Sequence, residues 1–345
     1  MASMSVERLK ASSIPVATGW LLGECMEARG KQDLWFRQRP EVMASLREQA
    51  IIQSVESSNR IEGVTVPKER LAPVALGKAR PRNRCEEELA GYRRALEWIF
   101  TRKADLPATP RLILHLHKLA QGGSGDAGQW KSRDNEIVEF LPSGEPVVRF
   151  RPTSAKQTPA AVGILCREYQ KACDEAAIPP LLAVATFVLD FLCIHPFRDG
   201  NGRVSRLLTT FLLLQHGLHV ARYVSLERLV EESKEEYYDI LGECSHGWHE
   251  SQNPVVPWWN YFLSVVRRAY GDLARQVQTA QSGPAKTELV RKAVLEQVGP
   301  FALGDISAQF PSVSVQLVKK VLGELKQTGQ LRLTGRGRGA RWEVR

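Results

Sequence analysis

Apolar residues recur at helical spacing through most of the first 280 positions of this chain. From residue 40 to residue 63 the pattern predicts one helix, with Pro40 at its first position and Gly63 as its C-terminal stop. The apolar positions of that repeat are Val42, Leu46, Ile51 and Val55. Similar patterns predict helices over residues 85–100, 111–121, 159–176, 181–194, 203–216, 226–244 and 256–278. The chain is therefore expected to be mainly α.

A different pattern interrupts the helices near residues 136–151. The sequence "EIVEFLPSGEPVVRF" consists of two short runs of strand-forming residues around a turn that contains Pro, Ser and Gly. Such runs on either side of a turn favour a β-hairpin. This is the clearest β signal before residue 280.

The last sixty or so residues follow a linker, "TAQSGPAK", and show the helical pattern three times. Helices are predicted over 286–298, 303–310 and 312–329, and residues 330–345 predict two short strands around a Gly/Arg-rich turn. Three helices followed by a β-hairpin resemble a winged helix-turn-helix. Residues 285–345 hold eleven Lys and Arg against five Asp and Glu, so they supply +6 of the net charge of +9. Such asymmetry suggests an acidic partner.

Length and composition are those of an ordinary globular protein with room for two or three domains: the chain has 345 residues. We expect an N-terminal helical region at 1–105, a central core with its packing helices at 106–280 and a C-terminal domain at 285–345. The N-terminus has no apolar signal region, and the longest apolar run, 181–194, is too short to cross a bilayer. Six scattered cysteines without a CxxC pair indicate reduced thiols. These features predict a cytoplasmic protein without a membrane partner.

The stretch "HPFRDGNGRVSR", residues 195–206, concentrates charge and glycine directly after the apolar helix 181–194. Pro196 disfavours a helical conformation at His195, and two glycines interrupt the residues that follow. We therefore expect one helix to end here and another to begin at Arg203. A Gly-rich loop that opens a helix is an anion site, because unpaired amide N–H groups and the positive end of the helix dipole face the same volume.

The charged side chains of this loop suit a polyphosphate. Arg203 and Arg206 are three residues apart, so both guanidinium groups can reach one side of the first helical turn. Asp199 would be repelled by a bare phosphate, and a bridging Mg²⁺ removes that conflict. His195 titrates near neutral pH and is the candidate to accept a proton from an attacking hydroxyl.

The same stretch matches the signature of the Fic family, HPFxxGNGRxxR, at every fixed position. In that family, the form with an acidic residue at the position of Asp199 is associated with transfer of AMP from ATP. The resemblance implies a Fic-type helical bundle with a β-hairpin flap. It also implies that His195 deprotonates a Ser, Thr or Tyr hydroxyl of a target protein, which then attacks the α-phosphate of ATP while pyrophosphate leaves.

The resemblance further implies how the nucleotide is held. Asp199 would hold Mg²⁺ against the α- and β-phosphates, Arg203 would grip the β-phosphate and Arg206 the γ-phosphate. The anion hole would consist of Gly200, Asn201 and Gly202. Phe197 is interpreted as an apolar anchor of the loop. The hairpin near 136–151 corresponds to the flap, whose edge pairs with the target's backbone, and a purely structural hairpin is the alternative.

A second motif lies N-terminal to the loop. Ser58, Glu62 and Gly63 in "SSNRIEG" resemble the family's inhibitory motif, [S/T]xxxE[G/N]. Ser58 and Glu62 are four residues apart and share a helix face. A carboxylate aimed at Arg206 would take the charge meant for the γ-phosphate, so the motif predicts autoinhibition. Two alternatives stay open: that Glu62 also orients water to remove AMP from a modified protein, and that it is an ordinary surface glutamate.

Other aromatic and ionisable residues lie in less specific patterns. "EEYYDIL" resembles the segment of the family that cradles adenine, which makes Tyr237 and Tyr238 candidate adenine contacts, although aromatic residues at helical spacing also suit a core. His117 lies on a predicted helix and is expected to be partly buried or on the surface. Asp190, inside the apolar helix, is assigned no role.

The basic tail has two interpretations. As a winged helix-turn-helix, its third helix would enter the major groove of DNA with Lys319 and Lys320, while Arg336 and Arg338 of the wing would meet phosphate. Winged helices also serve as protein-docking modules, and the sequence does not separate the two.

The leading hypothesis is a protein adenylyltransferase that uses ATP and Mg²⁺ and is held in check by Glu62. The alternative from another class is a DNA-binding transcription regulator that works through residues 285–345, with the Fic portion modifying itself or sensing nucleotide. A third hypothesis keeps the enzyme but changes the nucleotide or reverses the reaction. The target protein stays open and includes the protein itself, and because related proteins often pair, a homodimer is a further hypothesis.

Overall fold

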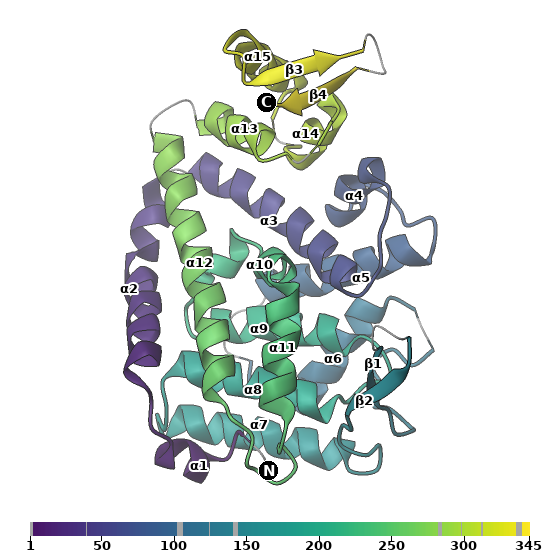
Figure 1. Cartoon of the computed structure of the whole chain (residues 1–345), viewed down its shortest axis with the longest axis vertical. Helices are drawn as coiled ribbons and strands as arrows, with labels where there is room; N and C mark the ends of the chain where they lie inside the picture. The colour runs from purple at the N-terminus through teal and green to yellow at the C-terminus, as the bar shows by residue number, and fades with distance from the viewer. Residues whose placement is uncertain are drawn as a thin grey trace.

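The computed structural model describes residues 3–38, 40–101, 106–123, 125–140, 144–281, 285–297, 299–311, 313–335 and 340–345. Its elements are α1 (Val6–Ala11), α2 (Val16–Gln38), α3 (Pro40–Ile61), α4 (Lys68–Ala75), α5 (Arg84–Thr101), α6 (Pro110–Gln121), β1 (Ile137–Phe140), β2 (Pro146–Phe150), α7 (Thr158–Asp174), α8 (Pro180–Ile194), α9 (Asn201–Gln215), η1 (His219–Arg222), α10 (Leu226–Glu232), α11 (Lys234–Ser245), α12 (Val256–Gln281), α13 (Ala285–Leu295), α14 (Leu303–Gln309), α15 (Val315–Gln327), β3 (Leu331–Thr334) and β4 (Arg341–Val344). The expectation of a mainly helical chain is confirmed (Figure 1). None of the described helices combines the length and the apolar character needed to span a membrane.

Helix α8 lies at the centre of the fold. Every residue from Leu181 to Ile194 is buried, because α7, α9 and α12 pack against this helix. A helix with no wet face needs no polar stripe, which explains its nearly continuous apolar sequence. One of its two polar residues, Asp190, accepts hydrogen bonds from the backbone N–H of Met4 at 2.8 Å and from the indole N–H of Trp248 at 2.7 Å. It therefore ties the N-terminal segment to the central helix, a role that the sequence pattern did not reveal.

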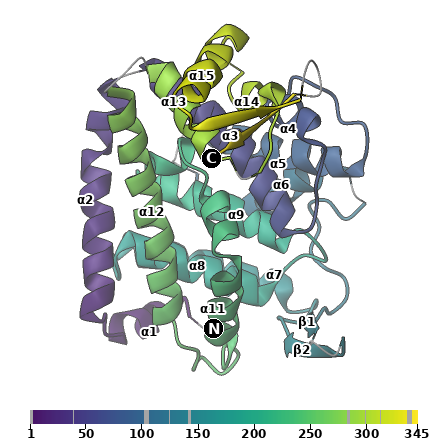
Figure 2. The ribbon, with the colours of Figure 1, turned by 45° about the horizontal axis from the view of Figure 1, so that its top comes forward.

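Two long helices, α2 and α12, lie side by side along one edge of the molecule (Figures 1 and 2). The sequence pattern predicted α12 but set no bounds for α2. The single helix predicted over 226–244 is wrong, because the chain breaks at Ser233 and divides into α10 and α11. The Ser233 hydroxyl donates to the carbonyl of Leu229 at 3.0 Å, a side-chain bond to the preceding turn of the kind that bends helices.

The strands β1 and β2 form an antiparallel pair in which Val138 faces Val148 and Glu139 faces Val147. Residues 141–143, where the turn is expected, lie outside the described residues. The two strands pair as the sequence predicts, whereas their use as a flap stays a prediction. The side chains of Val138, Val147 and Val148 are exposed.

The C-terminal unit, which we define as α13 to β4, consists of three helices followed by an antiparallel pair of strands. Phe301 and Trp342 exchange two backbone hydrogen bonds of 2.8 and 2.7 Å and so add a short third segment beside β4. The order of elements is the predicted one, and the assignment as a winged helix-turn-helix stays a prediction. The unit contacts α3, α4 and the end of α12 (Figure 1).

Candidate active site

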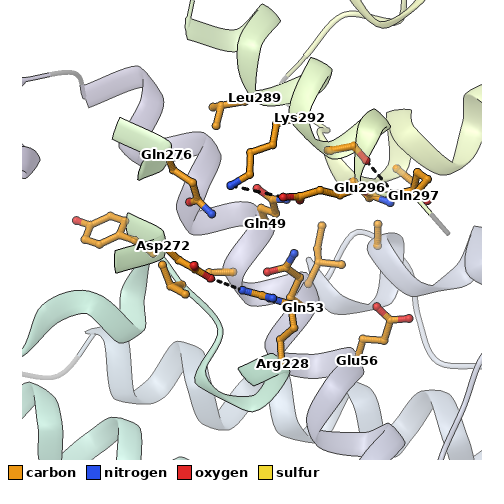
Figure 3. A pocket seen from close by; sticks show the side chains of 18 of the residues that line it. Gln49, Gln53, Glu56, Arg228, Asp272, Gln276, Leu289, Lys292, Glu296 and Gln297 are labelled. Atoms are coloured by element: carbon orange, nitrogen blue, oxygen red, sulfur yellow. Dashed lines mark hydrogen bonds and ion pairs between the residues drawn. The ribbon is translucent and has the colours of Figure 1, made fainter. Parts of the chain in front are cut away.

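Two cavities could be the candidate site, and their linings differ. The larger, about 740 Å³, lies between the C-terminal unit, α3 and α12 (Figure 3). Charged side chains on its wall pair with each other, as Arg228 does with Asp272 at 2.8 Å. The smaller, about 150 Å³, is lined by residues of the predicted loop and of the second motif, namely Glu62, His195, Gly202 and Arg206. Because the smaller cavity joins a helix N-terminus to a titratable base, we take it as the candidate active site.

The backbone of the loop turns sharply between α8 and α9. His195 caps α8 in the left-handed region, at φ +49° and ψ 61°, and its N–H donates to the carbonyl of Phe191 at 3.0 Å. Gly200 is also left-handed, at φ +80°, and α9 begins at Asn201. The helix thus starts two residues before the predicted Arg203. The side chain of Asn201 closes the loop, since its Oδ1 accepts from the N–H of Phe197 at 2.9 Å and its Nδ2 donates to the Phe197 carbonyl at 2.8 Å.

A carboxylate of the chain itself lies where an anion would bind. The first amides of α9 have no acceptor within the helix, as at any helix N-terminus. Glu62 Oε1 lies over this end of the helix, so close that a Cβ added to Gly202 would be only 2.3 Å from it. The same oxygen accepts from Nη2 of Arg206 at 2.7 Å. Gly202 therefore leaves room for an oxyanion at this point, and Glu62 supplies one.

Arg206 is held from three directions by the end of α3. Its Nε donates to the Ser58 hydroxyl at 2.9 Å, and its Nη2 donates both to the Ser58 carbonyl at 2.8 Å and to Glu62. Gly63 follows at φ +80°, where a residue with a Cβ would be strained, and ends the helix as predicted. The structure brings Ser58, Glu62 and Arg206 together as the motif led us to expect. Their regulatory role stays a prediction.

Arg203 points the other way and is buried, with a side chain only 2% exposed. Its Nη1 donates to Glu88 of α5 at 2.8 Å and its Nη2 donates to Gln121 of α6 at 3.3 Å. Nη2 also lies 3.4 Å from a carboxylate oxygen of Asp199. Sequence reasoning missed Glu88 and Gln121. The available signal was that Glu88 lies on the same face of its predicted helix as apolar residues, but nothing local in the sequence pairs it with Arg203.

His195 has the properties of a neutral base. Its Nδ1 lies 3.3 Å from the carbonyl of Leu192, and the tautomer in which Nδ1 donates to that carbonyl leaves Nε2 as the proton acceptor. Burial lowers the pKa of His195 to about 4, and the charge of Lys131 also lowers it, whereas the Leu192 carbonyl, Glu62 and Asp199 oppose the shift. The imidazole is therefore unprotonated at neutral pH and available to accept a proton.

Phe197 anchors the loop from behind, as expected. Its ring is fully buried and stacks on His117, with 3.7 Å between ring centroids, and more loosely on Trp130. His117 is itself fully buried, so the expectation of a partly buried or surface histidine is wrong. Its Nδ1 accepts from the N–H of Gly128 at 3.0 Å, and its Nε2 donates to the carbonyl of Asp199 at 3.1 Å. Burial lowers the pKa of His117 to about 4.

The carboxylate of Asp199 fits a magnesium ion that arrives with phosphate. Its side chain is 58% exposed, and Oδ1 accepts from the N–H of Gly200 at 2.6 Å, so the carboxylate is oriented at the mouth of the loop. In the described part of the chain, no three His, Cys, Asp or Glu side chains gather as a metal cage. One carboxylate suffices for Mg²⁺, which usually takes its other ligands from substrate phosphates and water.

The remaining wall of the cavity comes from α11 and from the hairpin. Tyr237 and Tyr238 both line it, with 5.1 Å between their ring centroids, next to Arg149 and Phe150 of β2. Tyr237 is buried and Tyr238 is partly exposed. The guanidinium of Arg149 donates to the carbonyl of Tyr238. The two tyrosines therefore lie at the site, and adenine binding stays a prediction.

The candidate DNA-binding residues lie elsewhere. Lys319 and Lys320 are exposed on α15, in the C-terminal unit. Arg336 and Arg338 fall outside the described residues.

Comparison with known proteins points to one family. Residues 107–213 match the Fic/DOC family. A curated relative, the protein adenylyltransferase Fic of Nematostella vectensis, is 24% identical over 209 residues, which are 58% of this chain and 44% of the relative. The chain thus matches less than half the length of that relative.

Solved structures with the same fold include three Fic proteins. A Fic family protein from Desulfovibrio desulfuricans G20 has a TM-score of 0.60 at 21% identity, and the match covers 97% of both chains. A Fic domain-containing signaling protein from Bacteroides thetaiotaomicron VPI-5482 also has a TM-score of 0.60, at 22% identity, over 74% of this chain and 97% of the other. Residues 134–508 of Fic-1 from C. elegans match with a TM-score of 0.58 at 19% identity, over 76% of this chain and 73% of the other. At these identities the likeness establishes the fold.

Proposed function

Because the chain carries a domain of the Fic/DOC family at residues 107–213, we propose that it is a protein adenylyltransferase that moves AMP from ATP to a hydroxyl of a target protein. One observation carries the proposal: a carboxylate oxygen of the chain lies at the N-terminus of α9 and on Arg206, the position for an oxyanion, beside the neutral imidazole of His195. A phosphate that replaced this carboxylate would meet the same donors.

The residues around the loop suit an in-line displacement. The hydroxyl oxygen of a Ser, Thr or Tyr forms a bond to the α-phosphorus of ATP, the bond from that phosphorus to the bridging oxygen breaks, and pyrophosphate leaves. Nε2 of His195 accepts the hydroxyl proton. The amides of Asn201 and Gly202 stabilise the charge that spreads over the phosphate oxygens, whereas the Gly200 amide donates to Asp199 Oδ1 and would have to release it to join them. Catalysis of this kind rests on positioning and charge, which the loop provides.

Asp199 would hold Mg²⁺ in this scheme. The ion neutralises the phosphates of the nucleotide when it is bound. The carboxylate of Asp199 accepts from the Gly200 N–H, and the backbone carbonyl of Asp199 accepts from His117. The guanidinium of Arg203 donates to Glu88 and supports the loop on the side away from the cavity. To bind the β-phosphate as proposed, this buried guanidinium would have to contact the nucleotide as well.

Glu62 would inhibit the reaction by volume as well as by charge. The cavity of about 150 Å³ is smaller than the roughly 300–1,000 Å³ of usual ligand pockets. The Glu62 carboxylate pairs with the guanidinium of Arg206, which would otherwise bind the γ-phosphate. Withdrawal of this one side chain would both enlarge the cavity and free the cation.

The test is to incubate the full chain with ATP labelled at the α-phosphate and, separately, at the γ-phosphate. Glu62→Ala is expected to incorporate the α-label into itself or into an added target, and to incorporate no γ-label. His195→Ala in the Glu62→Ala background is expected to lose the α-label. Glu56→Ala, within α3, is the matched control and should behave as the unchanged protein. Mass spectrometry of the product separates AMP from UMP or another nucleotide, and absence of any nucleotide adduct would reject the proposal.

The reverse reaction is a second outcome of the same assay. A protein already labelled by the Glu62→Ala variant would lose AMP when mixed with the unchanged protein if Glu62 orients a water molecule. Labelling of an inactive His195→Ala copy by an active copy would support the proposed self-modification within a homodimer.

We also propose that the chain consists of three domains, at residues 1–105, 106–280 and 285–345.

A DNA-binding function for the C-terminal unit is favoured by its element order and by two exposed lysines on α15, Lys319 and Lys320. The full chain would then slow the migration of duplex DNA in a gel mobility-shift assay. Its affinity for the DNA should fall steeply as the salt concentration rises. Lys319→Glu combined with Lys320→Glu should abolish the shift, whereas the same changes at the exposed Lys118 and Lys156 should not. A chain that binds no DNA even at low salt would leave protein docking as the function of this unit.

A further inference from the structure

A short segment between α6 and β1 grips the loop at the residues that flank His195. The backbone N–H of Lys131 donates to the carbonyl of Pro196 at 2.9 Å. The ammonium of Lys131 donates to the carbonyl of Ile194 at 3.3 Å and to the side-chain oxygen of Asn135 at 2.8 Å.

Asn135 completes this grip. Its Nδ2 donates to the carbonyl of Phe197 at 3.2 Å. Three backbone carbonyls, one before His195 and two after it, are therefore held by two side chains and one backbone N–H of the segment 131–135. The fold does not need a lysine to fill this space, because an apolar residue would suit a side chain that is only 5% exposed.

We propose that Lys131 is a positioning residue for the reaction: with Asn135 it fixes the carbonyls on either side of His195 and so holds the imidazole at the rim of the anion site. The inference rests on the proposed adenylyl transfer. It adds to that function a residue outside both the loop and the inhibitory motif.

The conformation of His195 shows why such a grip is needed. A residue with a Cβ is disfavoured in the left-handed region, so the surrounding contacts must impose the φ of +49° at His195. The hydrogen bond from Lys131 to the Ile194 carbonyl fixes the peptide that joins Ile194 to His195, and the one to the Pro196 carbonyl fixes the peptide that joins Pro196 to Phe197. With both ends held, the side chain of His195 leaves the backbone in one direction.

The grip also joins the loop to the hairpin. Asn135 precedes β1 by two positions, so the segment that holds Phe197 continues directly into the strand that begins at Ile137. A target that pairs with the hairpin would therefore be placed relative to His195 through a short, hydrogen-bonded connection.

The charge on Lys131 gives the proposal a distinctive pH signature. Burial lowers the pKa of Lys131 to about 8, and Asp134 on the same segment acts in the opposite direction. The titratable group that faces it from the loop is His195, whose pKa the lysine lowers in turn. Because a lysine is neutral above its pKa, the charge that strengthens the bond to the Ile194 carbonyl is lost above about pH 8.

The experiment uses the full chain in the Glu62→Ala background and measures kcat and KM for ATP from pH 6 to pH 10. Lys131→Met is expected to lower kcat at least about tenfold and to change KM for ATP less than about threefold, since the phosphate donors are untouched. Lys131→Arg is expected to keep most of the activity at pH 7. Its decline at high pH should begin at least about one unit later than that of the parent, because a guanidinium stays charged. Lys156→Met, at an exposed lysine, is the matched control.

The outcomes separate the two proposals. If the Glu62→Ala parent transfers no nucleotide, the proposed function fails. If the Glu62→Ala parent is active and Lys131→Met shows the same kcat and the same pH profile as the parent, the proposed role of Lys131 is overturned. If Lys131→Met does not fold, the pH profile of Lys131→Arg decides. A decline in activity that begins at the same pH as in the parent overturns the proposal, and a decline that begins at a higher pH supports it.

Discussion

The two arginines of the loop lie three residues apart on the same helix, yet their surroundings differ. Arg203 faces what we call the rear wall, made of Glu88 from α5 and of Gln121 and His117 from α6. Arg206 faces the front wall, which is the end of α3 with Ser58 and Glu62. The side chains of the rear ion pair are 2% and 11% exposed, against 8% and 29% for the front pair.

This difference shows how one chemical pair can serve two purposes. Glu88 lies in the second turn of α5, with a helical turn on either side of it. Glu62 lies one residue beyond the last residue of α3 and is followed by a glycine. A carboxylate fixed within a helix makes a permanent contact, whereas one at a helix end can swing away without breaking the helix. The rear wall is therefore structural and the front wall is suited to release.

The body of α3 is anchored just before the releasable end. Ser54 donates to the buried carboxylate of Glu227 at 2.6 Å, and Tyr92 of α5 donates to the other oxygen of the same group at 2.8 Å. Because this network fixes the helix one turn before Ser58, departure of Glu62 requires movement of its side chain and the last turn only. The comparison of the two walls leads to four predictions.

The largest effect is expected at the rear wall. Glu88→Ala would leave the buried guanidinium of Arg203 with only the exposed carboxylate of Asp199 at 3.4 Å, and breaking a buried pair in this way destabilises a protein by about 3–5 kcal/mol. Urea unfolding of the full chain measures the change. Arg84→Ala, which removes only the exposed partner of Glu88, is the control and should change the free energy of unfolding by less than about 1 kcal/mol. A loss of similar size in both variants would contradict a structural rear wall.

The next effect is a pH dependence that arises at His117. The folded protein keeps this histidine neutral with a pKa of about 4, against 6.5 in the unfolded chain, so the unfolded state binds more protons between these values. Its contribution is complete above pH 6.5 and is lost as the pH falls toward 4. Between pH 7 and pH 5 the free energy of unfolding should fall by about 2 kcal/mol on this account.

The matched variant is His117→Phe, which can stack on Phe197 but does not titrate. Its free energy of unfolding should change between pH 7 and pH 5 by about 2 kcal/mol less than that of the unchanged protein. Equal changes in the two proteins would mean that His117 is not held neutral by the fold.

The elements that the sequence predicted correctly are those whose signal is local. The apolar run of α8, the stop at Gly63 and the turn at Pro196 depend on neighbouring residues, and each is present in the structure. The first glycine of the loop also predicted the sharp turn between α8 and α9, where Gly200 is left-handed. Short-range chemistry is sufficient for these features.

The partners that the sequence did not reveal are distant in the chain. Glu88 and Gln121 lie 115 and 82 positions from Arg203. Helical periodicity places Glu88 on an apolar face, but it does not identify the distant side chain that pairs with a buried charge. The break at Ser233 was also missed, because a serine inside a helical pattern is tolerated until its hydroxyl bonds back to the preceding turn.

A smaller effect is expected at Ser58, which links the anchored body of α3 to the front wall. Ser58→Ala removes the acceptor of Arg206 Nε and leaves a buried N–H without a partner, at a cost of about 1–2 kcal/mol. Ser57→Ala, at an equally buried neighbour, is the control for loss of a hydroxyl. Unfolding in urea should place Ser58→Ala below Ser57→Ala in stability, and the reverse order would exclude Ser58 as a support of Arg206.

The smallest effect on stability and the most visible effect on activity are expected in the same variant. Glu62→Gln keeps the shape of the side chain but removes the charge on a partly exposed group, so the free energy of unfolding should change by less than about 1 kcal/mol. Because a neutral amide competes poorly with phosphate for a guanidinium, labelling from ATP should rise at least about tenfold, equivalent to 1.4 kcal/mol. Urea unfolding and the α-label assay measure the two quantities on one preparation. A large loss of stability with no gain in labelling would make the front wall structural, like the rear wall, and would remove the difference between the two arginines.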